Sequence, residues 1–177
     1  NRPRPELLKH LGGASAAPQW FYEDKRWGLH FDGNANYVNF PREALPYGAF
    51  TLQFEIRPSE AGRSEVLFRN FSHHDGSLNL FRHNDKLMMI FTRRTAQNKS
   101  ELIRITTSLE LPAGSWSNVS VAMDLENITF NVNGKSEEKA FPYQGYFFKP
   151  SVFGGHVYPA FAMPSSNTKF FKGDLRF

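Results

Sequence analysis

The sequence contains no cysteine, so it has neither a disulfide framework nor thiol chemistry. It lacks a run of apolar residues long enough to cross a bilayer, so we expect no membrane span. Charge of one sign is not concentrated either: 21 Lys and Arg are dispersed among 17 Asp and Glu, which argues against nucleic acid as a partner. With 177 residues the chain is long enough to bury a core, and we expect one domain.

Common catalytic motifs are missing as well. The sequence has no Gly-x-Ser-x-Gly, no phosphate-binding loop, no Gly-x-Gly-x-x-Gly and no His-Glu-x-x-His. The nearest carboxylate pair, Asp124 and Glu126, falls in a turn, where we interpret it as solvated rather than as acid–base machinery. Neighbours on an extended chain face opposite ways, so we interpret His73, His74 and Asp75 as a polar turn and not as a zinc site. The sequence therefore predicts a protein that is not an enzyme.

Phenylalanine is abundant, with 18 residues, and it occurs in short segments where apolar and polar side chains alternate. The clearest segment is FTLQFEIRP, residues 50–58, whose apolar residues share one face of a strand and whose final proline cannot donate to a ladder. Asn133-Gly134 predicts a two-residue hairpin turn. The same period of two predicts further strands at residues 27–31, 37–40, 65–70, 77–82, 86–92, 101–107, 116–123, 128–132 and 170–177.

The strand pattern predicts an all-β, antiparallel β-sandwich or jelly roll, because strands with one apolar face must stack in two sheets to bury it. We expect residues 27–31 and 37–40 to pair as a hairpin around the turn at 33–36. Residues 1–24 lack the period, and we interpret them as a lead-in segment with a stretch at 6–11 that suits a short helix. The sandwich domain then spans residues 25–177.

Five segments occur in an order that resembles a laminin-G-like domain of the concanavalin A-like lectin/glucanase superfamily. They are LHFDGNANYVNFP at 29–41, FTLQFEIRP at 50–58, LPAGSWSNVSVAMDLENITFNVNGK at 111–135, FGG at 153–155 and FKGDLRF at 171–177. Glucanases of this superfamily carry Glu-x-Asp-x-x-Glu on one strand face, whereas no Glu of this sequence has Asp two positions later. The resemblance therefore implies a sandwich without glycoside hydrolysis.

The resemblance also implies a structural calcium ion where the turn after the first strand meets the last strand. Asp32 and Asp174 occupy the matching positions. The family often ends with Asp-Glu, whereas here Leu175 follows Asp174, so a second acidic ligand is missing. The alternative stays open that Asp32 only favours its turn and that Asp174 faces solvent.

A carbohydrate platform needs exposed aromatic rings flanked by polar groups. We interpret residues 19–27 and 141–159 as two aromatic loops that satisfy this requirement as a set. For any one ring taken alone, packing in the core or at its edge is the preferred interpretation, because aromatic side chains are mostly buried in sandwiches. The candidate ligand-binding residues are Trp20, Tyr22, Tyr146, His156 and Tyr158.

The leading functional hypothesis is a non-catalytic, lectin-like module that binds a polysaccharide or glycan. Because the sequence starts at Asn1 without a charged-then-apolar leader, we expect that a signal peptide, a tag or an upstream domain has been removed. An exported protein, extracellular or periplasmic, agrees with this expectation. The alternative is a structural or protein-interaction domain that packs beside a catalytic domain and binds no sugar.

Overall fold

The chain folds into short strands. This computed structural model describes residues 18–34, 36, 38–40, 49–70, 77–94, 100–124, 126–141, 151–153 and 168–176, and within these residues there is no helix, hence none that could cross a membrane. The strands are β1 Gln19–Glu23, β2 Arg26–Asp32, β3 Val38–Phe40, β4 Phe50–Pro58, β5 Ser64–Asn70, β6 Ser77–His83, β7 Lys86–Arg94, β8 Ser100–Glu110, β9 Ser117–Met123, β10 Asn127–Val132, β11 Lys135–Ala140, β12 Ser151–Phe153, β13 Thr168–Phe170 and β14 Lys172–Arg176.

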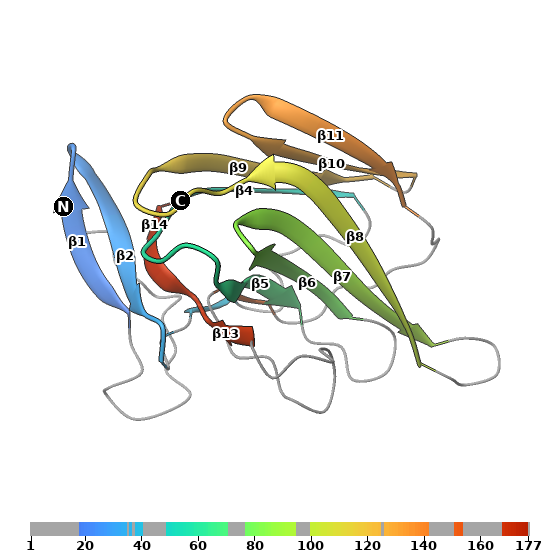
Figure 1. Cartoon of the computed structure of the whole chain (residues 1–177), viewed down its shortest axis with the longest axis horizontal. Helices are drawn as coiled ribbons and strands as arrows, with labels where there is room; N and C mark the ends of the chain where they lie inside the picture. Colours follow the sequence, from blue (N-terminus) through green and yellow to red (C-terminus); the bar gives the residue numbers. More distant parts are fainter. Residues whose placement is uncertain are drawn as a thin grey trace.

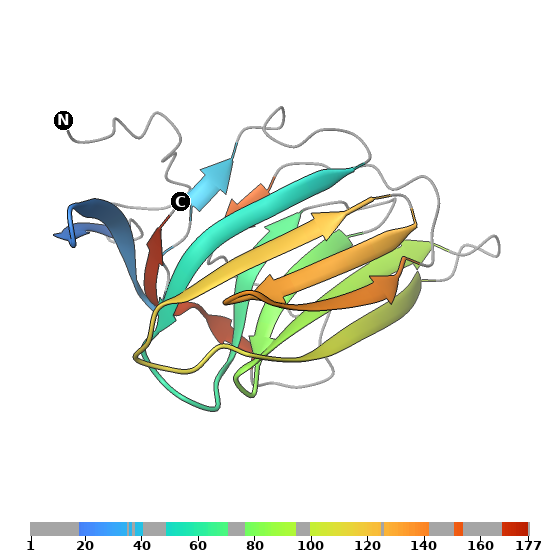
Figure 2. The ribbon, with the colours of Figure 1, turned by 90° about the horizontal axis from the view of Figure 1, so that it is seen from above.

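The strands form two stacked sheets, as the sequence predicts. The first sheet has the order β1-β2-β14-β4-β9-β10-β11, and the second has the order β3-β12-β5-β6-β7-β8. All of these neighbours are antiparallel, while β13 lies off the path and pairs with β5 in parallel. Figure 1 shows the two layers, with β4 and β9–β11 over β5–β7, and Figure 2 shows the same layers from above. The fold is an all-β sandwich.

The core lies between the two sheets and is built by alternate residues of each strand. In β4 the buried residues are Phe50, Phe54, Ile56 and Pro58, and in β14 Gly173 and Leu175 follow the same alternation. Burial of apolar surface on this scale is the main stabilising contribution to a sandwich of this kind. The period of two that is visible in the sequence therefore corresponds to the inner and outer faces of the sheets.

The predicted hairpin between residues 27–31 and 37–40 is wrong. Both edges of β2 are already occupied, by β1 on one side and β14 on the other, and β3 pairs with β12 in the second sheet. The chain changes sheets at Asp32, whose backbone N–H donates to Asn36 Oδ1 at 2.7 Å and whose Oδ1 accepts the N–H of Asn34 at 2.8 Å. Gly33, at φ +79°, permits this turn.

The predicted lead-in segment 1–24 also needs correction at its end. Gln19–Glu23 form the edge strand β1, which pairs with β2 over its whole length. The connecting residues Asp24 and Lys25 have φ values of 53° and 62°, the positive values that a tight two-residue hairpin requires. The aromatic segment 19–27 is therefore a hairpin and not a loop. The stretch 6–11, which we expected to suit a helix, lies outside the described residues.

A buried ion pair joins the two sheets at one end of the core. Arg82 of β6 and Glu65 of β5 are both 0% exposed, and Arg82 Nη1 donates to Glu65 Oε2 at 3.1 Å. The other oxygen of Glu65 accepts the backbone N–H of Lys172, at the start of β14, at 3.0 Å. Arg82 also donates to the carbonyl oxygens of Leu111 and Glu60, at 2.9 and 2.8 Å. The pair thus connects the second sheet to the first.

The strand β14 occupies the centre of the first sheet. It lies between β2 and β4, with Leu175 opposite Leu29 on one side and Ile56 on the other. In sequence, these two neighbouring strands precede β14 by more than a hundred residues. The first sheet is therefore continuous only when β14 is in place.

Candidate functional site

Three aromatic rings form a row on one face of the β1–β2 hairpin. Tyr22 and Trp27 lie directly opposite each other in the ladder, with ring centroids 5.0 Å apart and planes tilted by 49°. Trp20 meets Trp27 edge-on, at 6.1 Å and 89°. Trp20 packs against the core, whereas Tyr22 is 59% exposed. The row, which we call the hairpin aromatic row, therefore runs from the core out to solvent.

The opposite face of the same hairpin is closed by Phe21. Its ring lies over Gly28, where a Cβ atom would come within 2.3 Å of Phe21 Cζ. It also stacks on Trp116, with centroids 6.3 Å apart and planes at 29°. The guanidinium of Arg176 lies 4.1 Å from the Trp116 centroid and 5.7 Å from that of Phe21. Because these rings and the cation cover one another, this face offers little aromatic surface to a sugar.

A network of charges continues from Trp116 along the outer face of the first sheet. Glu23 accepts from Arg57 Nη1 at 3.1 Å, from Arg176 Nη2 at 2.9 Å and from Trp116 Nε1 at 3.4 Å. Arg57 also lies 4.7 Å from the centroid of the Trp116 ring. Burial alone would lower the pKa of Arg57, but hydrogen bonds to Asp174 and Glu23 outweigh it and raise that pKa. Trp116 is thus part of this network.

The two carboxylates predicted to bind calcium have different surroundings. Asp174 lies opposite His30 in the ladder, and its Oδ1 is 2.7 Å from His30 Nδ1 while its Oδ2 is 2.8 Å from Arg57 Nη2. Asp32 is exposed and binds the backbone of its own turn. Among the residues that the structure describes, no three His, Asp or Glu side chains are grouped as metal ligands. Calcium takes six or more oxygen ligands, and one oxygen of Asp174 already faces the positive charge of Arg57. In this arrangement Asp174 does not fit a calcium site.

Calcium binding at Asp32 and Asp174 stays a prediction that can be measured directly. If the ion binds, it has to displace Arg57, and calcium at a hundred times its dissociation constant would add about 2.7 kcal/mol to the free energy of unfolding. Thermal unfolding with calcium and with a chelator would reveal this as a higher midpoint in calcium. An Asp174→Asn variant, which removes a charged ligand, should abolish the difference. An equal difference in that variant would place any calcium elsewhere.

The structure describes only part of the site predicted from the sequence. Trp20 and Tyr22 come together in the hairpin aromatic row, with Trp27 between them. Tyr146, His156 and Tyr158 lie outside the described residues, as does the polar turn at 73–75. Asp124 is exposed and caps the turn before β10, which agrees with its interpretation as a turn residue.

The charged residues Glu23, Arg57 and Arg176 were not predicted from the sequence. A signal for two of them was present, because Arg57 and Arg176 occupy the polar positions of strands whose apolar positions were recognised. Which polar side chains meet depends on the pairing of β14 with β4, and the period of two says nothing about pairing.

Comparison with protein families identifies the fold group. A laminin G family model, described as the concanavalin A-like lectin/glucanases superfamily, matches residues 32–176. A comparison with curated protein sequences finds no match.

Solved structures share the fold at low sequence identity. One is domain 4 of AbnA, an extracellular GH43 arabinanase from Geobacillus stearothermophilus, in complex with arabinotriose: the TM-score is 0.69 at 13% identity, over 93% of this chain and 73% of that one. A second is the LG4-5 pair of mouse laminin α1, with a TM-score of 0.65 and 15% identity over 99% of this chain and 45% of that one. A third is the receptor-binding domain of a botulinum neurotoxin C/D mosaic serotype. Its TM-score is 0.55 at 10% identity, over 89% of this chain and 41% of that one. At these identities the likeness concerns the fold.

Proposed function

The chain belongs to the concanavalin A-like lectin/glucanase superfamily, and on that premise we propose that it is a non-catalytic module that binds carbohydrate at its hairpin aromatic row. The observation that carries the proposal is the exposed ring of Tyr22, which packs at a tilt against Trp27 while Trp20 packs against the core. Aromatic faces pack on the apolar C–H surfaces of sugars, and a ring that is already fixed loses little conformational freedom on binding.

The position of the row supports this role. Tyr22 and Leu102 are the only large apolar side chains among the described residues that are highly exposed, at 59% and 41%. Leu102 is an aliphatic residue of β8 in the second sheet. Tyr22, in contrast, has a second ring directly opposite it in the ladder, which gives a sugar an aromatic surface wider than one side chain.

The surroundings of the carboxylates support the non-catalytic part of the proposal. Asp174 is held between Arg57 and His30, and Glu23 between two arginines and Trp116. Asp124 is occupied by the backbone of its own turn. A retaining or inverting glycosidase needs two carboxyl groups that face one another across a substrate, one of them free to hold a proton.

The relatives support an exported, multidomain context, which we include in the proposal. The arabinanase relative is extracellular and contributes one domain, solved in complex with arabinotriose. A module of this kind would bind a polysaccharide next to a catalytic neighbour. The laminin relatives are compatible with the alternative, a domain that packs against other proteins and binds no sugar.

The test is the affinity for oligosaccharides before and after removal of the exposed ring. A glycan array, with arabinotriose as one probe, selects a ligand, and isothermal titration measures its dissociation constant. Tyr22→Ala should weaken binding at least about tenfold, or about 1.4 kcal/mol, because the sugar loses the ring on which it stacks. Leu102→Ala, which removes the other exposed apolar side chain, is the matched control and should leave binding unchanged. Absence of binding to every glycan would favour the protein-interaction alternative.

A further inference from the structure

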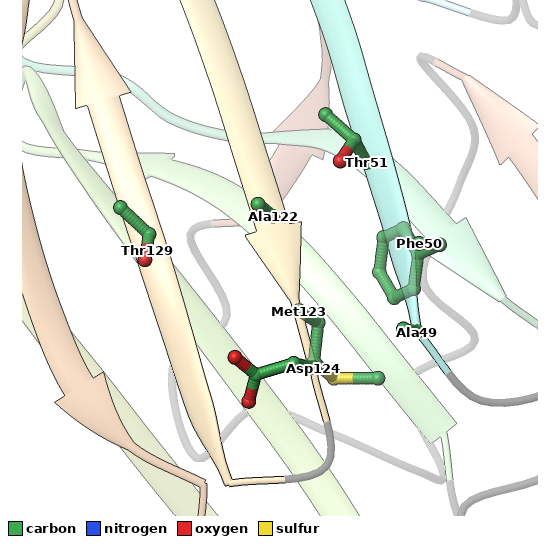
Figure 3. A pocket seen from close by; sticks show the side chains of 7 residues that line it. All are labelled: Ala49, Phe50, Thr51, Ala122, Met123, Asp124 and Thr129. Carbon is green, nitrogen blue, oxygen red and sulfur yellow. The ribbon is translucent and has the colours of Figure 1, made fainter.

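A groove lies on the first sheet, away from the hairpin aromatic row. It has a volume of about 520 Å³ at the ends of β4, β9 and β10 and is lined by Ala49, Phe50, Thr51, Ala122, Met123, Asp124 and Thr129. Three strands of the same sheet separate β1 from β9, so the two features are separate parts of the surface. Figure 3 shows the lining side chains, with Thr51 and Thr129 on either side of Ala122.

The hollow follows from a short side chain between two longer ones. Ala122 of β9 is directly opposite Thr51 of β4 and also directly opposite Thr129 of β10. Side chains that are opposite each other in neighbouring strands project from the same face of a sheet. The methyl group of Ala122 therefore forms the floor, and the two threonine side chains stand beside it as walls that carry hydroxyl groups.

One end of the groove is formed by a carboxylate that is fixed in place. Asp124 Oδ1 accepts the backbone N–H groups of Glu126, at 2.7 Å, and Asn127, at 2.5 Å. These bonds, first that from Asn127 and then that from Glu126, lower the pKa of Asp124. The group is thus a permanent acceptor at neutral pH, and the turn fixes its orientation.

The surrounding positions have polar but no cationic side chains. Glu138 of β11 is opposite Thr129, and the next row across the sheet consists of Gln53, Ser120 and Asn131. Among the described residues of these two rows there is no Lys or Arg, although the chain as a whole has a net charge of +4. An anionic ligand would meet only like charge here, whereas the hydroxyl groups of a neutral ligand would find acceptors and donors.

We propose that this groove is a second carbohydrate site, selective for neutral sugars: Asp124 accepts from the hydroxyl groups of one sugar ring, Thr51 and Thr129 bond to its edge, and Ala122 contacts its apolar face. The proposal rests on the proposed function and extends it in two respects. It gives the chain two sites instead of one, and it makes neutral glycans the favoured class. A sugar with a carboxylate or sulfate group is rejected at Asp124.

The test is a titration of the ¹⁵N-labelled chain with a neutral oligosaccharide selected on the array, arabinotriose among the probes. Amide signals of Thr51, Ala122 and Thr129 should shift, separately from those of Tyr22 and Trp27. Ala122→Leu, which fills the floor, should weaken binding in the groove at least tenfold and leave the hairpin shifts in place. Asn118→Leu, an exposed position two rows away on the same strand and face, is the matched control and should leave the groove shifts unchanged. Thermal unfolding checks that both variants fold.

The outcomes separate this inference from the proposed function. If only the hairpin signals shift, or if Ala122→Leu binds in the groove as well as the original chain, the second site is refuted and the proposed function stands. If a uronic acid oligosaccharide of equal length shifts the groove signals equally, the selectivity is refuted. If no oligosaccharide shifts any signal, the proposed function fails and this inference fails with it.

Discussion

Gly173→Ala should cost about 4 kcal/mol or more of the free energy of unfolding. A Cβ atom at this position would lie 2.4 Å from the carbonyl oxygen of Arg57 and 2.9 Å from Pro58 Cα, both backbone atoms of the neighbouring strand β4. A side chain could rotate away, but a paired strand cannot. The φ of +149° is itself a conformation that residues with a Cβ rarely adopt, which adds about 1–3 kcal/mol of strain. Single substitutions that cost this much free energy are rare, and here the backbone clash and the strain at positive φ account for the cost.

Urea denaturation measures this cost, provided that the variant and the original chain have the same m-value. Gly114→Ala is the matched control. Gly114 also has a positive φ, +76°, but a Cβ there would have no atom within 4 Å. The control should therefore lose only the free energy of unfolding that corresponds to the strain of a positive φ, about 1–2 kcal/mol. Equal losses in the two variants would show that close strand approach contributes nothing at Gly173.

Arg82→Met should destabilise the chain by about 3–5 kcal/mol at neutral pH. Arg82 is fully buried, and its removal leaves the equally buried Glu65 without the charge that Arg82 supplies and Leu111 without a donor to its carbonyl oxygen. Breaking a buried ion pair from one side costs up to this much because the remaining charge loses its buried partner. Arg63 Nε lies 3.0 Å from Glu65 Oε1 and still compensates part of that charge, so we expect a loss at the lower end of this range. The double variant Arg82→Met/Glu65→Leu should recover most of the loss, since it removes both charges. A double variant as unstable as the single one would contradict the electrostatic explanation.

The pH dependence of the single variant supplies a second readout. Burial raises the pKa of Glu65, while the Lys172 N–H and the charges of Arg63 and Arg82 oppose that rise. A carboxyl group whose pKa is raised in the folded state stabilises the fold below its unfolded pKa, about 4.3, and this contribution is lost as the pH rises through the folded pKa. Without Arg82 the folded pKa rises further. The loss caused by Arg82→Met should therefore be largest near pH 7 and shrink toward pH 4.5.

The strands of the fold were predictable because the alternation of buried and exposed residues can be seen within a single short segment of sequence. The alternation in FTLQFEIRP predicted β4. Asn133-Gly134 predicted the hairpin turn between β10 and β11, where the two residues have φ values of 52° and 83°. The edge strand β1 was missed because its turn, Asp24-Lys25, reaches positive φ without a glycine. The pairing of β2 was predicted wrongly because the partner of a strand is chosen by distant segments: β14 lies more than a hundred residues away.

The candidate site was predictable only where one segment builds it. Trp20, Tyr22 and Trp27 lie within one hairpin, so their proximity follows from the local chain. The Glu23, Arg57 and Arg176 network joins three strands whose register no local pattern specifies. The groove is harder still to predict, because it arises from the small size of Ala122. An alanine on the outward face of a strand does not by itself indicate a binding site.

The central place of β14 has a consequence for synthesis on the ribosome. The hairpin β1–β2 and the block β4-β9-β10-β11 emerge as two separate pieces, and each presents a hydrogen-bonding edge that β14, residues 172–176, covers in the folded chain. At usual elongation rates, β14 is synthesised on the order of ten seconds after β4, and the edge of β4 stays unpaired during that interval. During this interval the nascent polypeptide is open to wrong strand partners, and a chaperone that shields unpaired edges would have its greatest effect there.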